Sequence, residues 1–223
     1  TARWDTRQID SIISEECRII HFTLQHLATK SWSQAHGKLM PTDIAVAADT
    51  ALALPVLTKA CHQRLTETRR AELQKRFDNI KARHEILRQK WQTTAEDGQG
   101  KSPIPLPYLT KQVWSVINGE DWALTSDSMR GWARRLWDWD KPYQYIGSEG
   151  LGCGLGQALG AALAHKPEGR LCIDFQPDGD LLFTPAALWT AAHHQIPMLV
   201  IMNNNRSYYN RERHQEMMAK KRE

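Results

Sequence analysis

Apolar residues in the second half of the chain form short runs that are separated by polar turns. Residues 171–175 and 198–202 are brief apolar runs of the kind that form buried strands. Between them, Thr184 followed by Pro185 predicts the capped start of a helix, which should end before Pro197. This order predicts a strand–helix–strand unit whose two strands are parallel.

A polar turn follows each of these predicted strands. Asp178-Gly179-Asp180 comes after the first strand, and Asn203-Asn204-Asn205 comes after the second. Because the carboxyl ends of parallel strands meet at one edge of a sheet, we expect a carboxylate and an amide oxygen to meet there. Such hard oxygen donors suit Mg²⁺. On spacing alone, an ordinary strand–helix–strand unit with two polar turns stays open as the alternative.

The Asp-Gly pair, the following helix and strand, and the Asn-Asn pair resemble the pattern of thiamine diphosphate enzymes. The likeness is greatest to the acetolactate synthase large subunit and benzoylformate decarboxylase group. The resemblance implies that the side chains of Asp178 and Asn205, and the backbone carbonyl of Ser207, bind Mg²⁺. It also implies that the two turns bind the cofactor. Three further residues of these turns would take part, namely Gly179, Asp180 and Asn204.

One position departs from the family pattern. The family has Gly-Asp-Gly, whereas this chain has Pro177 before Asp178. Proline has no N–H to donate, which puts a backbone contact to diphosphate at this position in question. The departure favours an alternative, a non-catalytic relative that kept the fold and lost cofactor binding.

A glycine-rich segment, residues 147–160, precedes the strand–helix–strand unit. No register of its glycines supplies the G-x-G-x-x-G fingerprint of dinucleotide-binding folds. We therefore expect a turn that lets the backbone approach a ligand, followed by a closely packed helix; a helix start without a ligand is the alternative. The resemblance implies that Leu151, between Gly150 and Gly152, supports the bent cofactor.

The predicted fold class is α/β, an open parallel sheet flanked by helices that forms a truncated thiamin diphosphate-binding fold. Residues 1–66 resemble the end of the family's α/β middle domain, and residues 67–106 are expected to be a connecting helix and a linker. Residues 107–223 are expected to form an incomplete C-terminal domain that binds thiamine diphosphate and Mg²⁺. Since no Met opens the chain, we interpret it as a piece of a longer protein.

The segment 67–93 is strongly charged, with an apolar stripe at helical spacing. One interpretation is an interaction module that uses this basic helix, for example with nucleic acid. Acidic residues are interleaved with the basic ones, and no stacking aromatic residues alternate with them. A solvated helix packed by one face is therefore favoured, and no nucleic-acid partner is expected.

Composition narrows the class of protein further. Hydrophobic residues make up 41% of the 223 positions, enough for a buried core, and the net charge is only +4. The four cysteines form no CxxC pair, which favours reduced thiols in a cytoplasmic protein. No run of about 18 apolar residues is present, so no membrane association is expected.

The resemblance implies a 2-oxo acid decarboxylase or carboligase that works as a homodimer or homotetramer. In the family, the glutamate that activates the cofactor lies on a separate N-terminal domain. Nothing in these residues resembles that domain, so the catalytic residue is unknown here and the isolated chain is expected to be inactive.

Overall fold

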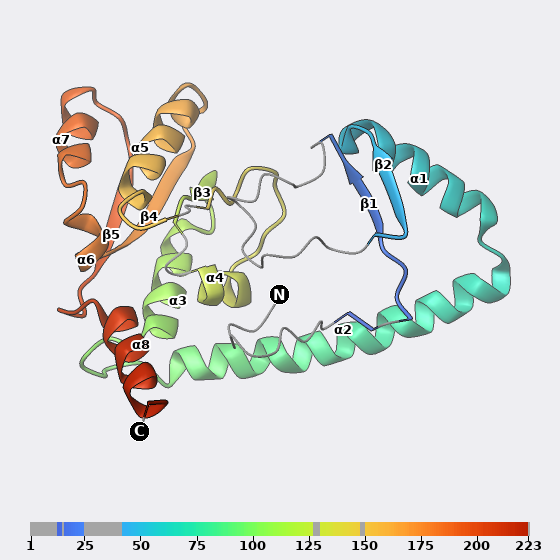
Figure 1. Ribbon diagram of the computed structural model, residues 1–223, viewed down its shortest axis with the longest axis horizontal. Coiled ribbons are helices and arrows are strands. Elements are labelled where there is room, and N and C mark those ends of the chain that lie inside the picture. Colours follow the sequence, from blue (N-terminus) through green and yellow to red (C-terminus); the bar gives the residue numbers. More distant parts are fainter. Residues whose placement is uncertain (1–12, 15, 25–41, 127–129, 148–149, 223) are drawn as a thin grey trace. The chain divides into compact units, whose positions relative to one another are not determined.

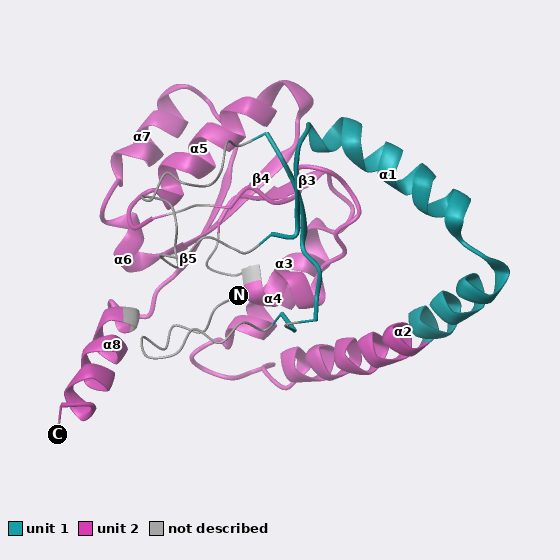
Figure 2. Cartoon of the chain, turned by 45° about the vertical axis from the view of Figure 1, so that its right-hand side comes forward, with its two compact units in different colours: residues 1–78 teal, residues 79–223 magenta. Residues whose placement is uncertain are grey.

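A computed structural model describes residues 13–14, 16–24, 42–126, 130–147 and 150–222. The chain divides into two compact units, residues 1–78 and 79–223 (Figure 2). Helix α2, Glu67–Glu96, begins in the first unit and ends in the second. No helix among the described residues is long and apolar enough to cross a membrane.

The first unit contains a small parallel sheet and a helix. Strand β1, Ile20–Thr23, pairs with β2, Ile44–Ala47, and α1, Thr50–Arg64, follows. The Asp49 carboxylate accepts the Ala51 N–H at 2.8 Å and so caps this helix. None of the residues of α1 is buried.

The second unit is built on a parallel sheet of three strands in the order β3-β4-β5. They are β3, Trp122–Leu124, β4, Leu171–Pro177, and β5, Leu199–Asn203. A bridge between Leu124 and Tyr145 adds a further parallel segment beside β3. The parallel strand–helix–strand unit expected from the sequence is therefore present, and the α/β class with an open parallel sheet is confirmed.

Helices cover both faces of this sheet (Figure 1). One face packs against the end of α2 and against α3 and α4, and the other packs against α5 and the segment that follows α7. A single turn, α6, follows β4, and α8 follows the turn after β5. Their bounds are α3, Leu106–Ile117; α4, Arg130–Leu136; α5, Gly154–His165; the 3₁₀ turn η1, Lys166–Glu168; α6, Asp178–Leu181; α7, Ala186–His193; and α8, Tyr209–Lys220.

The alternation of side chains along the strands explains why the two faces differ. In β4, Ile173 and Phe175 point to a tryptophan-rich core, whereas Cys172 points to the face that α5 covers. Trp122 and Trp137 meet edge to face in that core, with their ring centroids 5.1 Å apart. The opposite face uses alanines and so lets α5 approach the sheet closely: Ala123 and Ala162 are buried there.

We expect Trp137→Ala to lower the free energy of unfolding by about 3–5 kcal/mol, because it removes a large side chain from a closely packed core. Trp137 is 2% exposed, and its indole N–H donates to the Thr110 carbonyl. Urea unfolding followed by circular dichroism measures the change. Trp189→Ala is the matched control, since Trp189 is 65% exposed; an equal loss in both variants would contradict the assigned core.

Candidate functional site

The register of β4 and β5 brings the two polar turns to one edge of the sheet. Pro177, the last residue of β4, is paired with Asn203, the last residue of β5. Asp178 and Asn204 are the first residues after these two strands, so both turns begin at the same edge of the sheet. The sequence-predicted meeting point therefore exists in the structure as a geometric feature.

The turn after β5 closes over the Asp178 carboxylate. Asp178 accepts the backbone N–H groups of Asn205 at 3.4 Å and Arg206 at 3.1 Å. The turn is fixed internally as well, since the Asn204 and Asn205 side-chain oxygens accept the N–H groups of Arg206 and Ser207. Arg206 adopts a left-handed φ of 55°, which costs about 1 kcal/mol and is offset by these bonds.

This donor set fits Mg²⁺ in its chemistry. The Asp178 carboxylate, the Asn205 side-chain oxygen and the Ser207 carbonyl are all hard oxygen donors, the kind that this ion prefers. Each carboxylate oxygen has two lone pairs, so accepting one N–H leaves capacity for a metal. The Ser207 hydroxyl donates to Glu212 instead, at 2.6 Å. No cluster of three or more His, Cys, Asp or Glu that could hold a metal occurs among the described residues.

The glycine-rich turn lies against the segment that follows β4. The Gly152 N–H donates to the Asp180 carboxylate at 2.7 Å, and the Thr184 hydroxyl donates to the Gly152 carbonyl at 3.1 Å. Gly150 and Gly152 have φ values of 95° and 76°, which glycine adopts without strain. Leu151 between them is 62% exposed and therefore accessible to a ligand.

The expectation that Thr184 caps α7 is wrong. Pro185 occupies the N-cap position, and no side chain caps the helix. The Thr184 hydroxyl is used for the bond to Gly152 instead. Tertiary contact has therefore overridden a local capping signal that the sequence alone favoured.

An aromatic side chain lies beside Gly179. A Cβ built at Gly179 would come within 2.7 Å of the Tyr208 ring, and the Tyr208 hydroxyl donates to the Gly179 carbonyl at 3.2 Å. Phe183 packs edge-on against Tyr208, with their ring centroids 6.3 Å apart. Gly179 thus allows the Tyr208 ring to lie directly on the backbone of α6.

A buried acid lies in β4, four residues before Asp178. Asp174 is fully buried, and neither of its carboxylate oxygens has a hydrogen-bond partner within the described part of the chain. Burial, and next the charge of Asp180, raise the pKa of Asp174 from 3.8 to about 7. The carboxyl therefore changes its charge near neutral pH.

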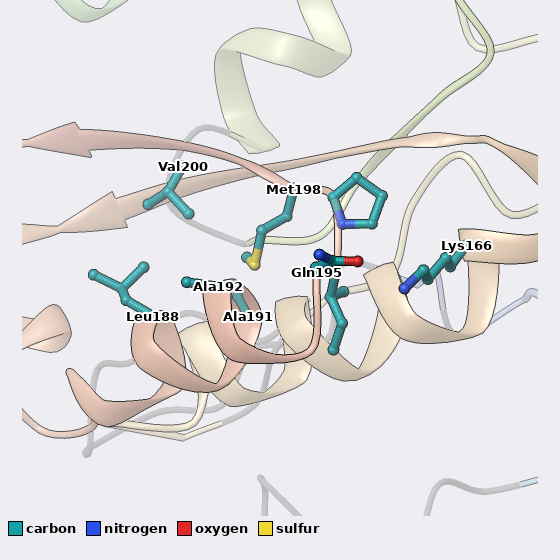
Figure 3. Close-up of a pocket in the computed structure, with 9 residues that line it drawn as sticks. Lys166, Leu188, Ala191, Ala192, Gln195, Met198 and Val200 are labelled. Atoms are coloured by element: carbon teal, nitrogen blue, oxygen red, sulfur yellow. The ribbon is translucent and has the colours of Figure 1, made fainter.

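A separate apolar groove of about 760 Å³ lies between α7 and β5. Figure 3 shows Met198, just before β5, and Val200 turned toward α7. Lys166 is the charged residue in its lining, and its ammonium group donates to the His194 carbonyl. None of the sequence-predicted site residues lines this groove, whose polar side chains are those of Lys166 and Gln195.

Comparison with known proteins agrees with the geometry. Residues 128–223 match the family described as thiamine pyrophosphate enzyme, C-terminal TPP binding domain; thiamine pyrophosphate, or TPP, is thiamine diphosphate. This part of the chain is similar to that family's C-terminal domain. The matched segment contains β4, β5 and both polar turns, and it therefore includes the whole site described above.

Among curated proteins, the chain is similar to acetolactate synthases. The chain is 29% identical over 131 residues to acetolactate synthase isozyme 1 large subunit of Escherichia coli, covering 53% of this chain and 23% of that protein. It is 25% identical over 212 residues to the chloroplastic acetolactate synthase of Arabidopsis thaliana, covering 91% and 29%. The chain thus spans about a quarter of the length of these relatives.

A solved structure is also similar in sequence. It is that of a putative thiamin diphosphate-dependent enzyme from Mycobacterium smegmatis, with 25% identity and a TM-score of 0.40. The match covers 44% of this chain and 20% of that one.

Several polar residues of the site were not predicted. Asp174 was read as part of an apolar run, although a charge inside such a run is itself a signal of a buried polar site. Asp180 and Thr184 were predicted in other roles, at the diphosphate and at the start of a helix, and their bonds to Gly152 form only after folding. By contrast, the family resemblance does suggest Ser126 and Asp127, after the predicted strand 122–125, as residues bordering the cofactor; Ser126 is buried, and Asp127 lies outside the described residues.

We expect Asp174→Asn to change the pH dependence of stability. The folded protein binds a proton at Asp174 more tightly than the unfolded chain does, so the acid stabilises the fold below pH 4 and loses this contribution as the pH rises to 7. The variant should therefore gain stability relative to the wild type by about 1.4 kcal/mol per pH unit between pH 5 and 7. Urea unfolding at pH 5, 6, 7 and 8 measures this difference.

Asp121→Asn is the matched control for this prediction. Its hydrogen bond with Arg170 is the largest cause that lowers the pKa of Asp121 below 3.8, so this group carries no proton to lose above pH 5. Its difference from the wild type should stay constant over the same range. Parallel stability curves for Asp174→Asn and the wild type would show that Asp174 does not titrate there.

Proposed function

We propose that residues 107–223 bind thiamine diphosphate and Mg²⁺ as part of a 2-oxo acid decarboxylase or carboligase that resembles the acetolactate synthase large subunit. The observation that carries this proposal is the closure of the Asn205–Arg206 turn onto the Asp178 carboxylate. The family match of residues 128–223 supports the choice of cofactor. Residues 1–66 would then be the end of a middle domain, and residues 67–106 a connector.

In this proposal the metal ion is held at the edge of the sheet. Asp178 and Asn205 contribute side-chain oxygens, and Ser207 contributes its backbone carbonyl. Asn204 keeps the turn in place by accepting the Arg206 N–H. A divalent ion there neutralises the Asp178 carboxylate and gives the diphosphate a cationic partner.

The diphosphate itself would face free backbone N–H groups. The first N–H groups of a helix have no acceptor within the helix, and those of Gly179 and Asp180 lie in the first turn of α6. The start of α7 adds a partial positive charge of the same kind. Pro177 donates no N–H, so these later groups carry the contact.

The exposed side chain of Leu151 would contact the rings of the cofactor. When bound, thiamine diphosphate supplies the nucleophilic carbon and the electron sink for decarboxylation of a 2-oxo acid. The chain's own contribution is to bind and orient this group. Homodimer or homotetramer assembly and a cytoplasmic location belong to the same proposal for the full-length protein.

We expect the 223-residue chain to bind thiamine diphosphate in a Mg²⁺-dependent manner. Asp178→Asn should weaken this binding at least about tenfold, because it removes the charge of a metal ligand and leaves the shape of the side chain unchanged. Isothermal titration calorimetry with and without Mg²⁺ measures both effects. Asp97→Asn is the control, since Asp97 is an exposed aspartate just after α2; equal affinity of Asp178→Asn and the wild type would refute the metal site.

We expect the same chain to release no CO₂ from 2-oxo acids, because the family's activating glutamate has no counterpart in these residues. The measurement is CO₂ release from a panel of 2-oxo acids with cofactor and Mg²⁺ present. A rate that depends on Asp178 would show instead that the catalytic groups lie within this chain.

A non-catalytic relative is the second candidate function, and Pro177 is the observation that favours it. Pro177 is both the last residue of β4 and the N-cap of α6, with ψ at 142°, so a residue without an N–H stands where the diphosphate turn begins. The calorimetric titration separates the two functions, because a relative that lost the cofactor binds thiamine diphosphate neither with Mg²⁺ nor without it.

A further inference from the structure

The segment 180–184 holds Gly152 from three sides. Asp180 accepts its N–H at 2.7 Å, and Thr184 donates to its carbonyl at 3.1 Å. A Cβ built at Gly152 would lie 2.8 Å from the Cβ of Phe183, so the backbone packs directly on that side chain. Asp180 lies in α6, and Phe183 and Thr184 lie in the turn that follows it, where their N–H groups donate to the Asp180 and Leu181 carbonyls.

The Asp180 carboxylate is itself held in place. Its second oxygen accepts the Gln176 side-chain amide at 2.8 Å. Gly154, the first residue of α5, leaves room for this pair, since a Cβ there would come within 3.0 Å of Asp180 and 3.1 Å of Gln176. Gln176 is 1% exposed, so the carboxylate is anchored to a buried side chain of β4.

These contacts connect two parts of the candidate site that lie far apart in the sequence. Gly152 follows Leu151, the residue proposed to contact the rings of the cofactor. Asp180 lies two residues after Asp178, the proposed metal ligand. The bond from Gly152 to Asp180 therefore sets the distance between the ring contact and the metal contact.

We propose that the Asp180 carboxylate, assisted by the Thr184 hydroxyl, is a positioning group that fixes the glycine-rich turn and so places Leu151 relative to Asp178. The role belongs to the side chain of Asp180 and is separate from any contact that its backbone N–H makes. This inference rests on the proposed function, because it concerns how the thiamine diphosphate site is assembled. A hydrogen bond to a carboxylate is among the stronger ones, which suits such a role.

Four variants test the proposal in calorimetric titrations with thiamine diphosphate and Mg²⁺. Asp180→Ala removes the acceptor, and Thr184→Val removes the hydroxyl; each should weaken cofactor binding about tenfold. Asp180→Asn keeps an oxygen for the Gly152 N–H and can pair with a rotated Gln176 amide, so we expect it to bind within about twofold of the wild type. Thr184→Ser keeps the hydroxyl and should behave likewise.

A second measurement does not need the cofactor. The Gly152 amide should exchange with solvent at least about tenfold faster in Asp180→Ala than in the wild type or Asp180→Asn, measured by NMR on the protein alone. Ile196→Val is the control for general destabilisation. It shortens a buried side chain of the segment that follows α7, away from the turn, and should leave cofactor affinity unchanged.

Each remaining outcome overturns a named part. If Asp180→Ala binds the cofactor like the wild type, or leaves Gly152 exchange unchanged, the positioning role is refuted. If Asp180→Asn binds the cofactor as weakly as Asp180→Ala, the negative charge of Asp180 supports cofactor binding, and the role of its hydrogen bond to Gly152 is refuted. If the wild type binds no thiamine diphosphate while Gly152 is protected through Asp180, the proposed function fails and the contact is structural only.

Discussion

The parallel pairing of β4 with β5 is the constraint on which the site depends. Because Pro177 and Asn203 end their strands side by side, the residues after them must leave at one edge. A parallel pair requires a long connection, here α6 and α7, so an acid and an amide that are distant along the chain become neighbours. A shift of this register by two residues would move the Asn204–Asn205 turn by about 7 Å and separate it from Asp178.

Small residues let the layers around this edge approach closely. Alanines on β3 and α5 let that helix pack closely on the sheet, and Gly154 at its start makes room for Asp180 and Gln176. The same helix begins immediately after the glycine-rich turn. Packing of α5 on the sheet therefore brings that turn into contact with the segment after β4. On the other face of the sheet, the tryptophan-rich core packs against the strands and holds them in place, and these strands carry the two turns at their ends.

Sequence patterns predicted the elements of this unit well, since its strands are short apolar runs bounded by Pro, Asp and Asn. They predicted that the turn after β5 lies beside Asp178, because that follows from topology alone; the observed contacts are made by backbone N–H groups of the turn, and a meeting of the carboxylate with an amide oxygen stays a prediction. The sequence patterns failed where a local interaction competes with a contact to a distant part of the chain. Thr184 could cap α7 or bond to a distant carbonyl, and only the folded chain shows that Gly152 is its acceptor. Asp174 was missed because one acid does not change the periodicity of a strand.

Charge at the edge of the sheet gives a reason why metal and diphosphate would have to bind together. Asp174, Asp178 and Asp180 fall within seven consecutive positions, and the charge of Asp180 already raises the pKa of the buried Asp174. An anionic diphosphate brought to this edge alone would meet like charges at short range. A divalent cation on Asp178 reverses the sign of that interaction, and it leaves the Asp180 carboxylate to hold the Gly152 amide. If the proposed metal site holds, the acids of one turn divide into a metal ligand, Asp178, and a structural acceptor for the Gly152 amide, Asp180.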